Sequence, residues 1–218
     1  MKLNIIIPAL EKNKYSTSGD LAPWGDTTLL EWKIYQAKKI NNVNNIFVAT
    51  PSKKIKALCK NLKINVISRK KNISISQLHY IVSKKFKNSY LLWLNPTSPF
   101  LSPKIIKKFI KNFNKVRSNH DCGIISKKEN EYYFFKKKSL NFDSHSFSVS
   151  RKKVSELIKI TNGAYLANAK ISKKKKSLFG NKPYFFQVDW LSSLEIKTTE
   201  DLNSFNILIK DYINKYQE

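Results

Sequence analysis

The stretch Tyr90-Leu91-Leu92-Trp93-Leu94-Asn95-Pro96-Thr97-Ser98-Pro99 decides the fold. Its apolar and aromatic first half predicts a buried strand, which stops abruptly at a polar loop. Pro96 and Pro99 fix φ and remove backbone donors, whereas Thr97 and Ser98 keep their hydroxyls and amides free. Ligands of open α/β sheets bind where strands end, so this loop is a candidate binding segment. Taken alone, it fits a proline-stiffened connection without a ligand at least as well.

Strand-like and helix-like segments alternate on both sides of this stretch. Further strands are predicted at 3–7, 45–49, 65–67 and 122–125, and apolar residues recur at helical spacing within 29–40, 55–62, 75–82 and 105–113. Such alternation predicts an α/β fold of three layers, Rossmann-like, with a mostly parallel central sheet and helices on both faces.

The rhythm breaks after residue 125. An irregular segment rich in lysine and aromatic residues covers 129–147, and extended segments are predicted at 164–167, 184–188 and 194–196. A closing helix is predicted to begin at Thr198, with Asp201 three residues later in a capping-box-like start. We find no internal repeat and no long linker, so residues 1–218 are predicted to form a single domain.

Length and composition favour a globular protein. The chain has 218 residues, of which 41% are hydrophobic and 12% aromatic. No apolar stretch approaches the roughly 18 residues that span a bilayer. Met1-Lys2 leads directly into a strand-like run, so we expect a cytoplasmic location and no membrane partner. Cys59 and Cys122 show no ligand spacing with each other or with a histidine, which argues against a disulfide framework or a zinc site.

The formal net charge of +26 raises nucleic acid or anionic membranes as partners. However, only Arg69, Arg117 and Arg151 are arginines. Bidentate phosphate and base recognition favours the planar guanidinium, so nucleic acid is disfavoured as a partner. Drift of surface positions toward lysine explains the charge better, with 136–138 and 173–176 as solvated turns, but a basic nucleic-acid-binding protein stays open as an alternative.

Four short segments occur in a recognisable order. They are Ile5-Ile6-Ile7-Pro8-Ala9, followed by Leu29-Leu30-Glu31-Trp32; Leu94-Asn95-Pro96-Thr97-Ser98-Pro99; Asn162-Gly163-Ala164, preceded by the basic Arg151-Lys152-Lys153; and Ser193-Leu194-Glu195-Ile196-Lys197-Thr198. Together, and over nearly the whole chain, they resemble the cytidylyltransferases that activate acidic sugars, the acylneuraminate (CMP-sialic acid) and related CMP-sugar synthetases.

This resemblance implies a nucleotidyltransferase domain that is GT-A-like. Its activity would transfer CMP from CTP to an acidic, sialic-acid-like sugar for surface polysaccharide biosynthesis, with release of pyrophosphate. It further implies Mg²⁺ as the cofactor, with Glu195 as a metal ligand, and a homodimer that pairs through 129–147. The implied nucleotide-binding residues are Pro8, Ala9, Lys14, Asn95, Pro96, Thr97 and Ser98, with Lys14 also catalytic, and the implied substrate-binding residues are Lys152, Lys153, Asn162, Gly163 and Phe179.

The sequence departs from the family pattern at several positions, including charged residues of the nucleotide loop and the metal motif. Leu10, Gly19 and Leu101 replace a family arginine, lysine and arginine, and Lys197 replaces an aspartate. A protonated lysine cannot coordinate Mg²⁺, although its charge can replace part of the charge of the ion. A non-catalytic descendant that binds a nucleotide or a partner therefore stays open.

Simpler interpretations of the implied site residues also stay open. Lys14 fits a solvated loop cation, and Lys152 and Lys153 fit an exposed turn. Asn162-Gly163 fits a type I′ turn, since that dipeptide is a hairpin signal by itself. Phe179 fits a core position.

Overall fold

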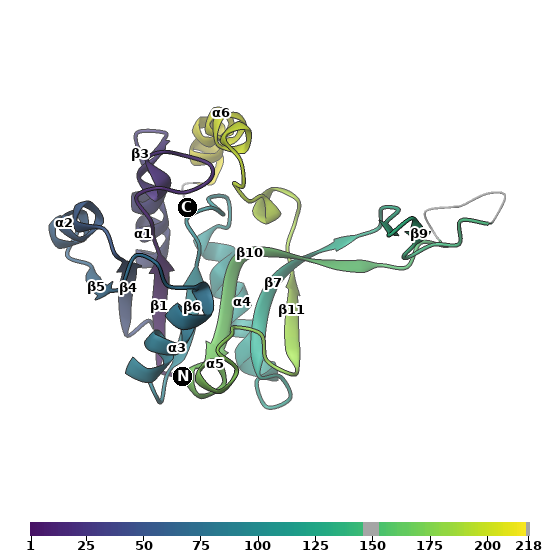
Figure 1. The fold of residues 1–218 in the computed structure, drawn as a ribbon, viewed down its shortest axis with the longest axis horizontal. Helices are drawn as coiled ribbons and strands as arrows, with labels where there is room; N and C mark the ends of the chain where they lie inside the picture. The colour runs from purple at the N-terminus through teal and green to yellow at the C-terminus, as the bar shows by residue number, and fades with distance from the viewer. Residues whose placement is uncertain (146–152, 217–218) are drawn as a thin grey trace.

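A seven-stranded sheet runs through the middle of the protein, in the order β11-β7-β10-β6-β1-β4-β5 (Figure 1). The computed structural model describes residues 1–145 and 153–216. The strands are β1 (Leu3–Pro8), β4 (Asn45–Thr50), β5 (Asn65–Ser68), β6 (Tyr90–Leu94), β7 (Cys122–Glu129), β10 (Leu157–Asn168) and β11 (Pro183–Gln187). All neighbouring strands run parallel except β10, which is antiparallel to β6 and β7. The predicted mostly parallel sheet is confirmed.

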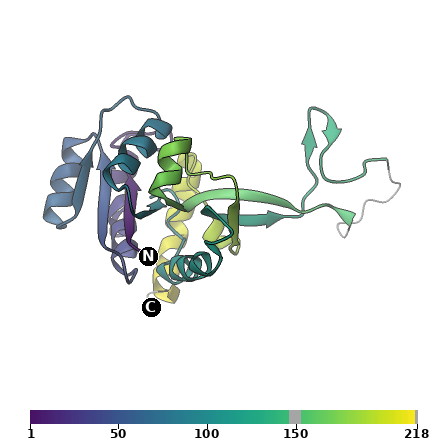
Figure 2. The ribbon, with the colours of Figure 1, turned by 90° about the horizontal axis from the view of Figure 1, so that it is seen from below.

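Helices cover both faces of the sheet, as Figure 2 shows. They are α1 (Leu29–Lys38), α2 (Lys53–Asn61), α3 (Ile75–Lys85), α4 (Pro103–Val116), α5 (Ala169–Lys175) and α6 (Thr199–Tyr216). Ile34 of α1, Ile55 of α2 and Phe109 of α4 share one core. Val82 of α3 and Ala169 of α5 belong to a second core on the opposite face. The predicted three layers are therefore present.

Local signals explain the elements that matter for the site. Central strands of parallel sheets are buried on both faces, and Ile5, Ile6 and Ile7 of β1 are accordingly 0% exposed. At α4, Ser102 caps the first turn through its hydroxyl, and Pro103 takes the first helical position, where no backbone donor is needed. At α6, Asp201 N donates to Thr198 Oγ1 while Asp201 Oδ2 accepts from Thr198 N, which confirms the predicted capping-box-like start.

A third core lies where α6 packs over the loops beyond the sheet. It includes Trp24, Phe100, Leu202 and Tyr212. Short elements surround it, namely the β2 (Pro23–Trp24) and β3 (Thr27–Thr28) pair and the 3-10 turns η1 (Gly19–Leu21) and η3 (Leu191–Ser193). The strand expected at 194–196 does not form, because the backbone N of Ile196 donates to Thr97 O instead of pairing in the sheet.

A long arm projects from the sheet (Figures 1 and 2). It is made by the far ends of β7 and β10, which remain paired out to Glu129 and Leu157, and by the hairpin of β8 (Phe134–Phe135) and β9 (Lys138–Ser139). The segment 129–147, expected to be irregular, thus contains a hairpin, and 146–147 lie outside the described residues. Its turn holds Lys136 and Lys137 at positive φ.

Two further expectations need correction. Lys173, Lys174 and Lys175 form the last turn of α5 rather than a solvated loop. Asn162-Gly163 is not a type I′ turn, because it lies inside β10 at a register shift between Ile160 and Tyr165. Within the part of the chain that is described, no helix has the length and apolarity to cross a membrane.

Candidate functional site

The loops that follow β1 and β6 lie at the same edge of the sheet. β1 and β6 are neighbouring parallel strands with Ile6 opposite Trp93, so both run toward the same edge. Ala9 and Asn95 each follow the last residue of one of these strands. The Pro8 and Asn95 loops therefore lie side by side, where α/β sheets bind their ligands.

Three side chains of helix α1 form hydrogen bonds to the loop that follows β6. Trp32 Nε1 and Gln36 Nε2 each donate to Pro99 O at 2.8 Å. Lys33 Nζ donates to Ser98 O at 2.8 Å and to Gln36 Oε1 at 2.7 Å. These bonds hold the backbone of the loop, and the buried Ser98 Oγ has no protein partner among the described residues. A preorganised loop with a free hydroxyl suits ligand binding.

Lys33 is an unusual component of this arrangement. Its side chain is 0% exposed, and both of its hydrogen-bond partners are neutral oxygens. Burial without a carboxylate partner lowers the pKa of Lys33 to about 7. Near neutral pH this lysine therefore exchanges between the charged and neutral forms while it supports the loop.

Asn162 and Gly163 close against the same loop. Asn162 has φ 54°, in the left-handed region that asparagine tolerates better than most residues. Asn95 Nδ2 donates to Asn162 O, and Asn95 N donates to Gly163 O at 3.2 Å. A Cβ on Gly163 would lie 3.0 Å from Leu101 Cδ2, so even an alanine would require the Leu101 side chain to shift by a few tenths of an ångström. The Asn162-Gly163 segment is thus held against the loop that begins at Asn95.

The fourth segment, 193–198, contacts the Asn162 segment through Glu195. Asn162 Nδ2 lies 3.2 and 3.3 Å from the two carboxylate oxygens of Glu195, and Asn162 Oδ1 accepts from the Tyr165 hydroxyl. The backbone N of Ile196 donates to Thr97 O at 2.8 Å. These bonds form a continuous chain from Asn95 through Asn162 to Glu195. Burial, followed by the nearby Glu195 charge, raises the pKa of Tyr165 to about 12, so its hydroxyl stays a donor at neutral pH.

The first loop reaches the same edge and is folded around Asp20. Asp20 Oδ2 accepts from Leu10 N at 2.7 Å, and Oδ1 accepts from the Tyr15 hydroxyl. Burial raises the pKa of Asp20 to about 6, an effect that the Tyr15 and Leu10 bonds and the nearby Arg69 oppose. Tyr15 O accepts from Thr199 Oγ1 at 3.0 Å, which ties this loop to the start of α6. All four segments therefore meet.

Magnesium fits this donor set poorly. Glu195 Oε2 lies 3.3 Å from Lys197 Nζ, so a cation already accompanies the carboxylate. No group of three histidine, cysteine, aspartate or glutamate side chains is placed to hold a metal anywhere in 1–145 or 153–216. Mg²⁺ prefers carboxylates, phosphates and water in an octahedron. One ion-paired carboxylate does not make a protein-built Mg²⁺ site.

The remaining expected site residues lie further out. Lys14 is exposed on the first loop. Lys153 is exposed on the arm, and Lys152 lies outside the described residues. Phe179 is 45% exposed rather than in the core, and its ring packs edge-on against Tyr165 at 5.7 Å between centroids. Phe179 thus lies behind the tyrosine that bonds Asn162.

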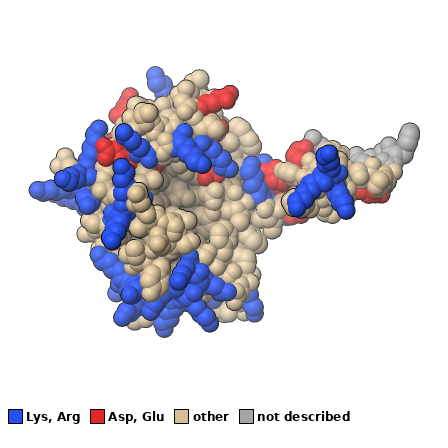
Figure 3. Space-filling model, in the orientation of Figure 1, with Lys and Arg blue, Asp and Glu red and all other residues tan. Residues whose placement is uncertain are grey.

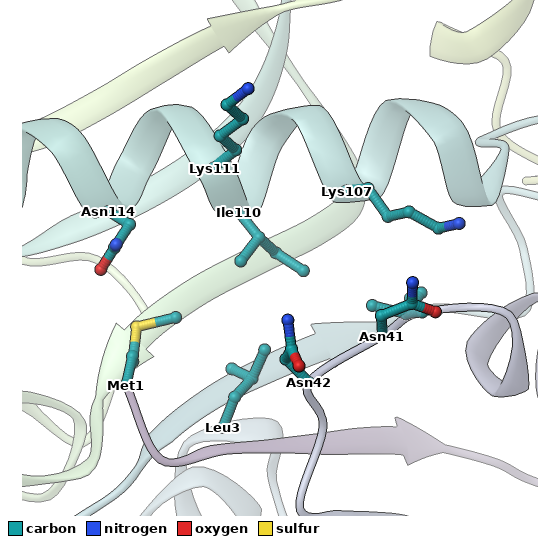
Figure 4. A pocket seen from close by; sticks show the side chains of 9 residues that line it. Met1, Leu3, Asn41, Asn42, Lys107, Ile110, Lys111 and Asn114 are labelled. Atoms are coloured by element: carbon teal, nitrogen blue, oxygen red, sulfur yellow. The ribbon is translucent and has the colours of Figure 1, made fainter.

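Two cavities help to delimit the site. One of about 240 Å³ adjoins the fourth segment and is lined by Lys127, Lys159, Thr161, Trp190, Ser193, Leu194, Glu195, Lys197, Asp201 and Phe205. A larger one of about 430 Å³ lies between α4 and the start of β1, with Ile110 and Leu3 facing each other across it and Lys107 and Lys111 at its rim (Figure 4). It is at the amino end of β1 and touches none of the four segments. We therefore place the candidate site at the carboxyl edge.

An open α/β sheet with polar loops gathered at this edge is typical of proteins that bind ligands at the carboxyl ends of strands. Residues 20–212 match the cytidylyltransferase family, which covers most of the chain. The chain belongs to this family and is therefore a nucleotidyltransferase enzyme by descent. No curated protein sequence matches the chain.

Solved structures share the fold at low sequence identity. CMP:2-keto-3-deoxy-manno-octonic acid synthetase complexed with CTP superposes with a TM-score of 0.72 at 11% identity, covering 97% of this chain and 99% of that one. The 4-diphosphocytidyl-2C-methyl-D-erythritol synthase from Anaerococcus prevotii DSM 20548 gives 0.68 at 14% identity, covering 96% and 98%. These similarities support the α/β nucleotidyltransferase fold. They do not single out a sialic acid synthetase.

Proposed function

We propose that this cytidylyltransferase transfers CMP from CTP to an acidic, sialic-acid-like sugar and releases pyrophosphate. The observation that carries the proposal is the chain of hydrogen bonds from Asn95 through Asn162 to Glu195. It joins the segments that resemble the acidic-sugar enzymes at one sheet edge. The CTP-bound neighbour with the same fold supports CTP as the nucleotide.

In this proposal the first two loops hold the nucleotide. The loop from Pro8 and Ala9 to Lys14 lies along the triphosphate, and Lys14, exposed on that loop, turns toward it. Asn95, Pro96, Thr97 and Ser98 contact the base or ribose, chiefly through the partly exposed Asn95 and Thr97, because the Ser98 hydroxyl is buried. Catalysis of phosphoryl transfer consists mostly of positioning and charge neutralisation, which amides and lysines of this kind supply.

The acceptor is proposed to lie beside the third and fourth segments. Its anomeric hydroxyl attacks the α-phosphorus of CTP, a new phosphorus–oxygen bond forms, and pyrophosphate leaves with the electrons of the broken bond. Asn162 and Gly163 border the acceptor and Phe179 supplies an apolar wall. Lys152 and Lys153 would pair with the sugar carboxylate.

Four further properties are part of the proposal. The enzyme acts in the cytoplasm, its product serves surface polysaccharide biosynthesis, and it is a homodimer that pairs through the arm. Exposed aromatic side chains on the arm support the last point, since Phe134 and Phe135 are 62% and 61% exposed. Mg²⁺ is retained as the cofactor, but because Glu195 is paired with Lys197 it would be brought in by the nucleotide phosphates and water rather than held by a protein-built site.

The test combines nucleotide binding with turnover. CTP, UTP and ATP are titrated with and without Mg²⁺, and pyrophosphate release is then followed with sialic acid, 2-keto-3-deoxy-manno-octonic acid, methylerythritol phosphate and a neutral hexose. We expect CTP to bind best and only the sugar acids to release pyrophosphate. Release with methylerythritol phosphate alone would reject the acidic acceptor. Tight CTP binding without turnover on any acceptor would favour the non-catalytic alternative.

A further inference from the structure

The cations of this chain are segregated from its acids. The sequence has no aspartate or glutamate between Glu31 and Asp121, and none between Glu156 and Asp189. Drift of surface positions toward lysine would add cations throughout without clearing acids from long stretches. Like charges in a compact domain repel one another, so such a distribution lowers the stability of the folded state. A functional role of the positive surface would explain why it is present.

One helix from each acid-free stretch, α3 and α5, lies on the same face of the sheet. Helices α3 and α5 pack side by side there and carry exposed lysines. The Tyr80 ring has Lys84 Nζ 5.5 Å and Lys176 Nζ 5.8 Å from its centroid, so ammonium groups from both stretches gather around one aromatic ring. We call this surface the α3–α5 face. It comprises Tyr80, Ile81, Lys84, Lys85, Lys87, Lys170, Lys173, Lys174, Lys175 and Lys176.

The α3–α5 face lacks carboxylate partners. The ion pairs found among the described residues lie on the arm and at Glu195, where Lys127, Lys128, Lys159 and Lys197 take part. Figure 3 shows lysine and arginine over much of the molecule, but its lower part carries only these basic residues, whereas acidic residues appear in the upper half and along the arm. The positive potential of this face is therefore not cancelled locally.

An apolar side chain accompanies the lysines. Ile81 is 43% exposed and lies on the same side of α3 as Lys84 and Lys85, three and four residues later. On α4, which also lacks acids, Ile106 and Phe109 are instead fully buried. Lysine with an exposed apolar residue on a helix is typical of surfaces that lie on a membrane.

The position of the face leaves the candidate site free. Lys87 lies just before β6 begins at Tyr90, and α5 begins next to Asn168, which is opposite Tyr90 in the sheet. The lysines are thus near the amino end of β6, whereas the four site segments lie at its carboxyl end. A surface bound to the α3–α5 face would not cover the nucleotide loops.

We propose that the α3–α5 face docks the protein on an anionic lipid bilayer. A bilayer suits the face better than nucleic acid, because all of its cations are lysines and none offers the planar bidentate fork of arginine. The proposal is independent of the acceptor assignment. It replaces the expectation of no membrane partner, which rested on the absence of a spanning segment.

Vesicle sedimentation tests the proposal with a matched pair of variants. The full chain is mixed with phosphatidylcholine vesicles or with vesicles containing phosphatidylglycerol, at about 0.1 M salt. The test variant is Lys84→Glu/Lys85→Glu/Lys173→Glu/Lys174→Glu. The control is Lys104→Glu/Lys107→Glu/Lys108→Glu/Lys111→Glu on α4, which changes the net charge equally on the opposite face of the sheet.

We expect wild type to bind only the anionic vesicles, the test variant to bind at least about tenfold more weakly, and the control to lose less than about threefold. Circular dichroism and the melting temperature verify that both variants fold. An equal loss of vesicle binding in both variants would mean that only the net charge matters, and it would overturn the assignment to this face. An absence of vesicle binding by wild type would also overturn the proposal. RNA binding tighter than vesicle binding and lost in the test variant would overturn the choice of a bilayer.

Discussion

Lys197 Nζ lies 3.3 Å from Glu195 Oε2, so an ammonium group stands where the family pattern has a second aspartate. The two side chains differ in exposure, at 59% for Lys197 and 14% for Glu195. The lysine is thus held at the solvent side of a carboxylate that is itself bonded to Asn162. This arrangement bears directly on how the enzyme handles the charge of a triphosphate.

Replacing Lys197 with aspartate is expected to increase the dependence of turnover on Mg²⁺. The ammonium repels a divalent ion and compensates phosphate charge itself, whereas Lys197→Asp would create a pair of carboxylates. Pyrophosphate release is measured across a Mg²⁺ titration. Lys210→Asp on the exposed side of α6 makes the same charge change and should leave the titration unaltered. Strong Mg²⁺ dependence of wild type, unchanged in Lys197→Asp, would show that the metal is bound elsewhere.

Asn162 is expected to act through its side chain. Asn162→Gly keeps the positive φ without strain but removes the bonds to Glu195, so catalytic efficiency should fall about tenfold or more while the free energy of unfolding changes by less than about 1 kcal/mol. Asn162→Ala should lose a further ~1 kcal/mol of stability, because alanine is strained at this φ. Steady-state kinetics and urea unfolding separate the two effects. Unchanged kinetics in Asn162→Gly would remove Asn162 from the site.

Lys33 is expected to make stability depend on pH. Its pKa in the folded protein is about 7, whereas an exposed lysine has a pKa of 10.5, so between these values the unfolded chain binds the extra proton. Stability should therefore rise with pH by about 2 kcal/mol from pH 7 to pH 9, and the contribution of Lys33 should become independent of pH below about 6, where both states bind the proton. Lys33→Met should flatten this rise, as measured by urea unfolding at several pH values. A parallel curve for both proteins would contradict the prediction.

Lys14 is expected to contact the nucleotide phosphates. A charge-assisted bond contributes about 1.5–3 kcal/mol, so Lys14→Ala should weaken CTP binding about tenfold or more at low salt. Lys12→Ala, on the same exposed loop, is the matched control and should change the affinity less than about threefold. Calorimetric titration measures both. Equal affinities for Lys14→Ala and wild type would mean that Lys14 is only a solvated cation.

The arm is expected to mediate pairing. Phe134→Ser/Phe135→Ser removes two exposed rings from its hairpin and should convert a dimer to a monomer in sedimentation velocity at micromolar concentration. Lys136→Ser/Lys137→Ser at the adjacent turn should leave the dimer intact. A wild-type monomer at that concentration would reject this role of the arm.

Much of the sheet could be predicted because its signals are local. The apolar run from Tyr90 to Leu94 ends at the strand boundary found in the structure, and Ser102-Pro103 marks the start of α4. Asn162-Gly163 is different, because the same dipeptide favours a turn or a bulge. Only the pairing of β10 with strands on both sides, which involves residues far away in sequence, decides between them.

The supporting residues of the site were not found from the sequence. Lys33 is one of many lysines, and nothing local distinguishes a buried one; its spacing of three residues from Gln36 was the available signal. Asp20 and Tyr15 lie in a polar loop without periodicity, so their pairing depends on how the loop folds back on Leu10. Such contacts are set by tertiary packing rather than by local preference.

Gly19 occupies a position in the first loop that has no space for a side chain. Its φ is 55°, and a Cβ there would lie 2.3 Å from Leu10 O, inside the backbone that Asp20 holds closed. The lysine that the family pattern has at this position therefore cannot be restored by a single substitution, because any side chain would collide with the main chain. An effort to engineer the family-type nucleotide loop into this protein would therefore have to transplant residues 10–20 as one block.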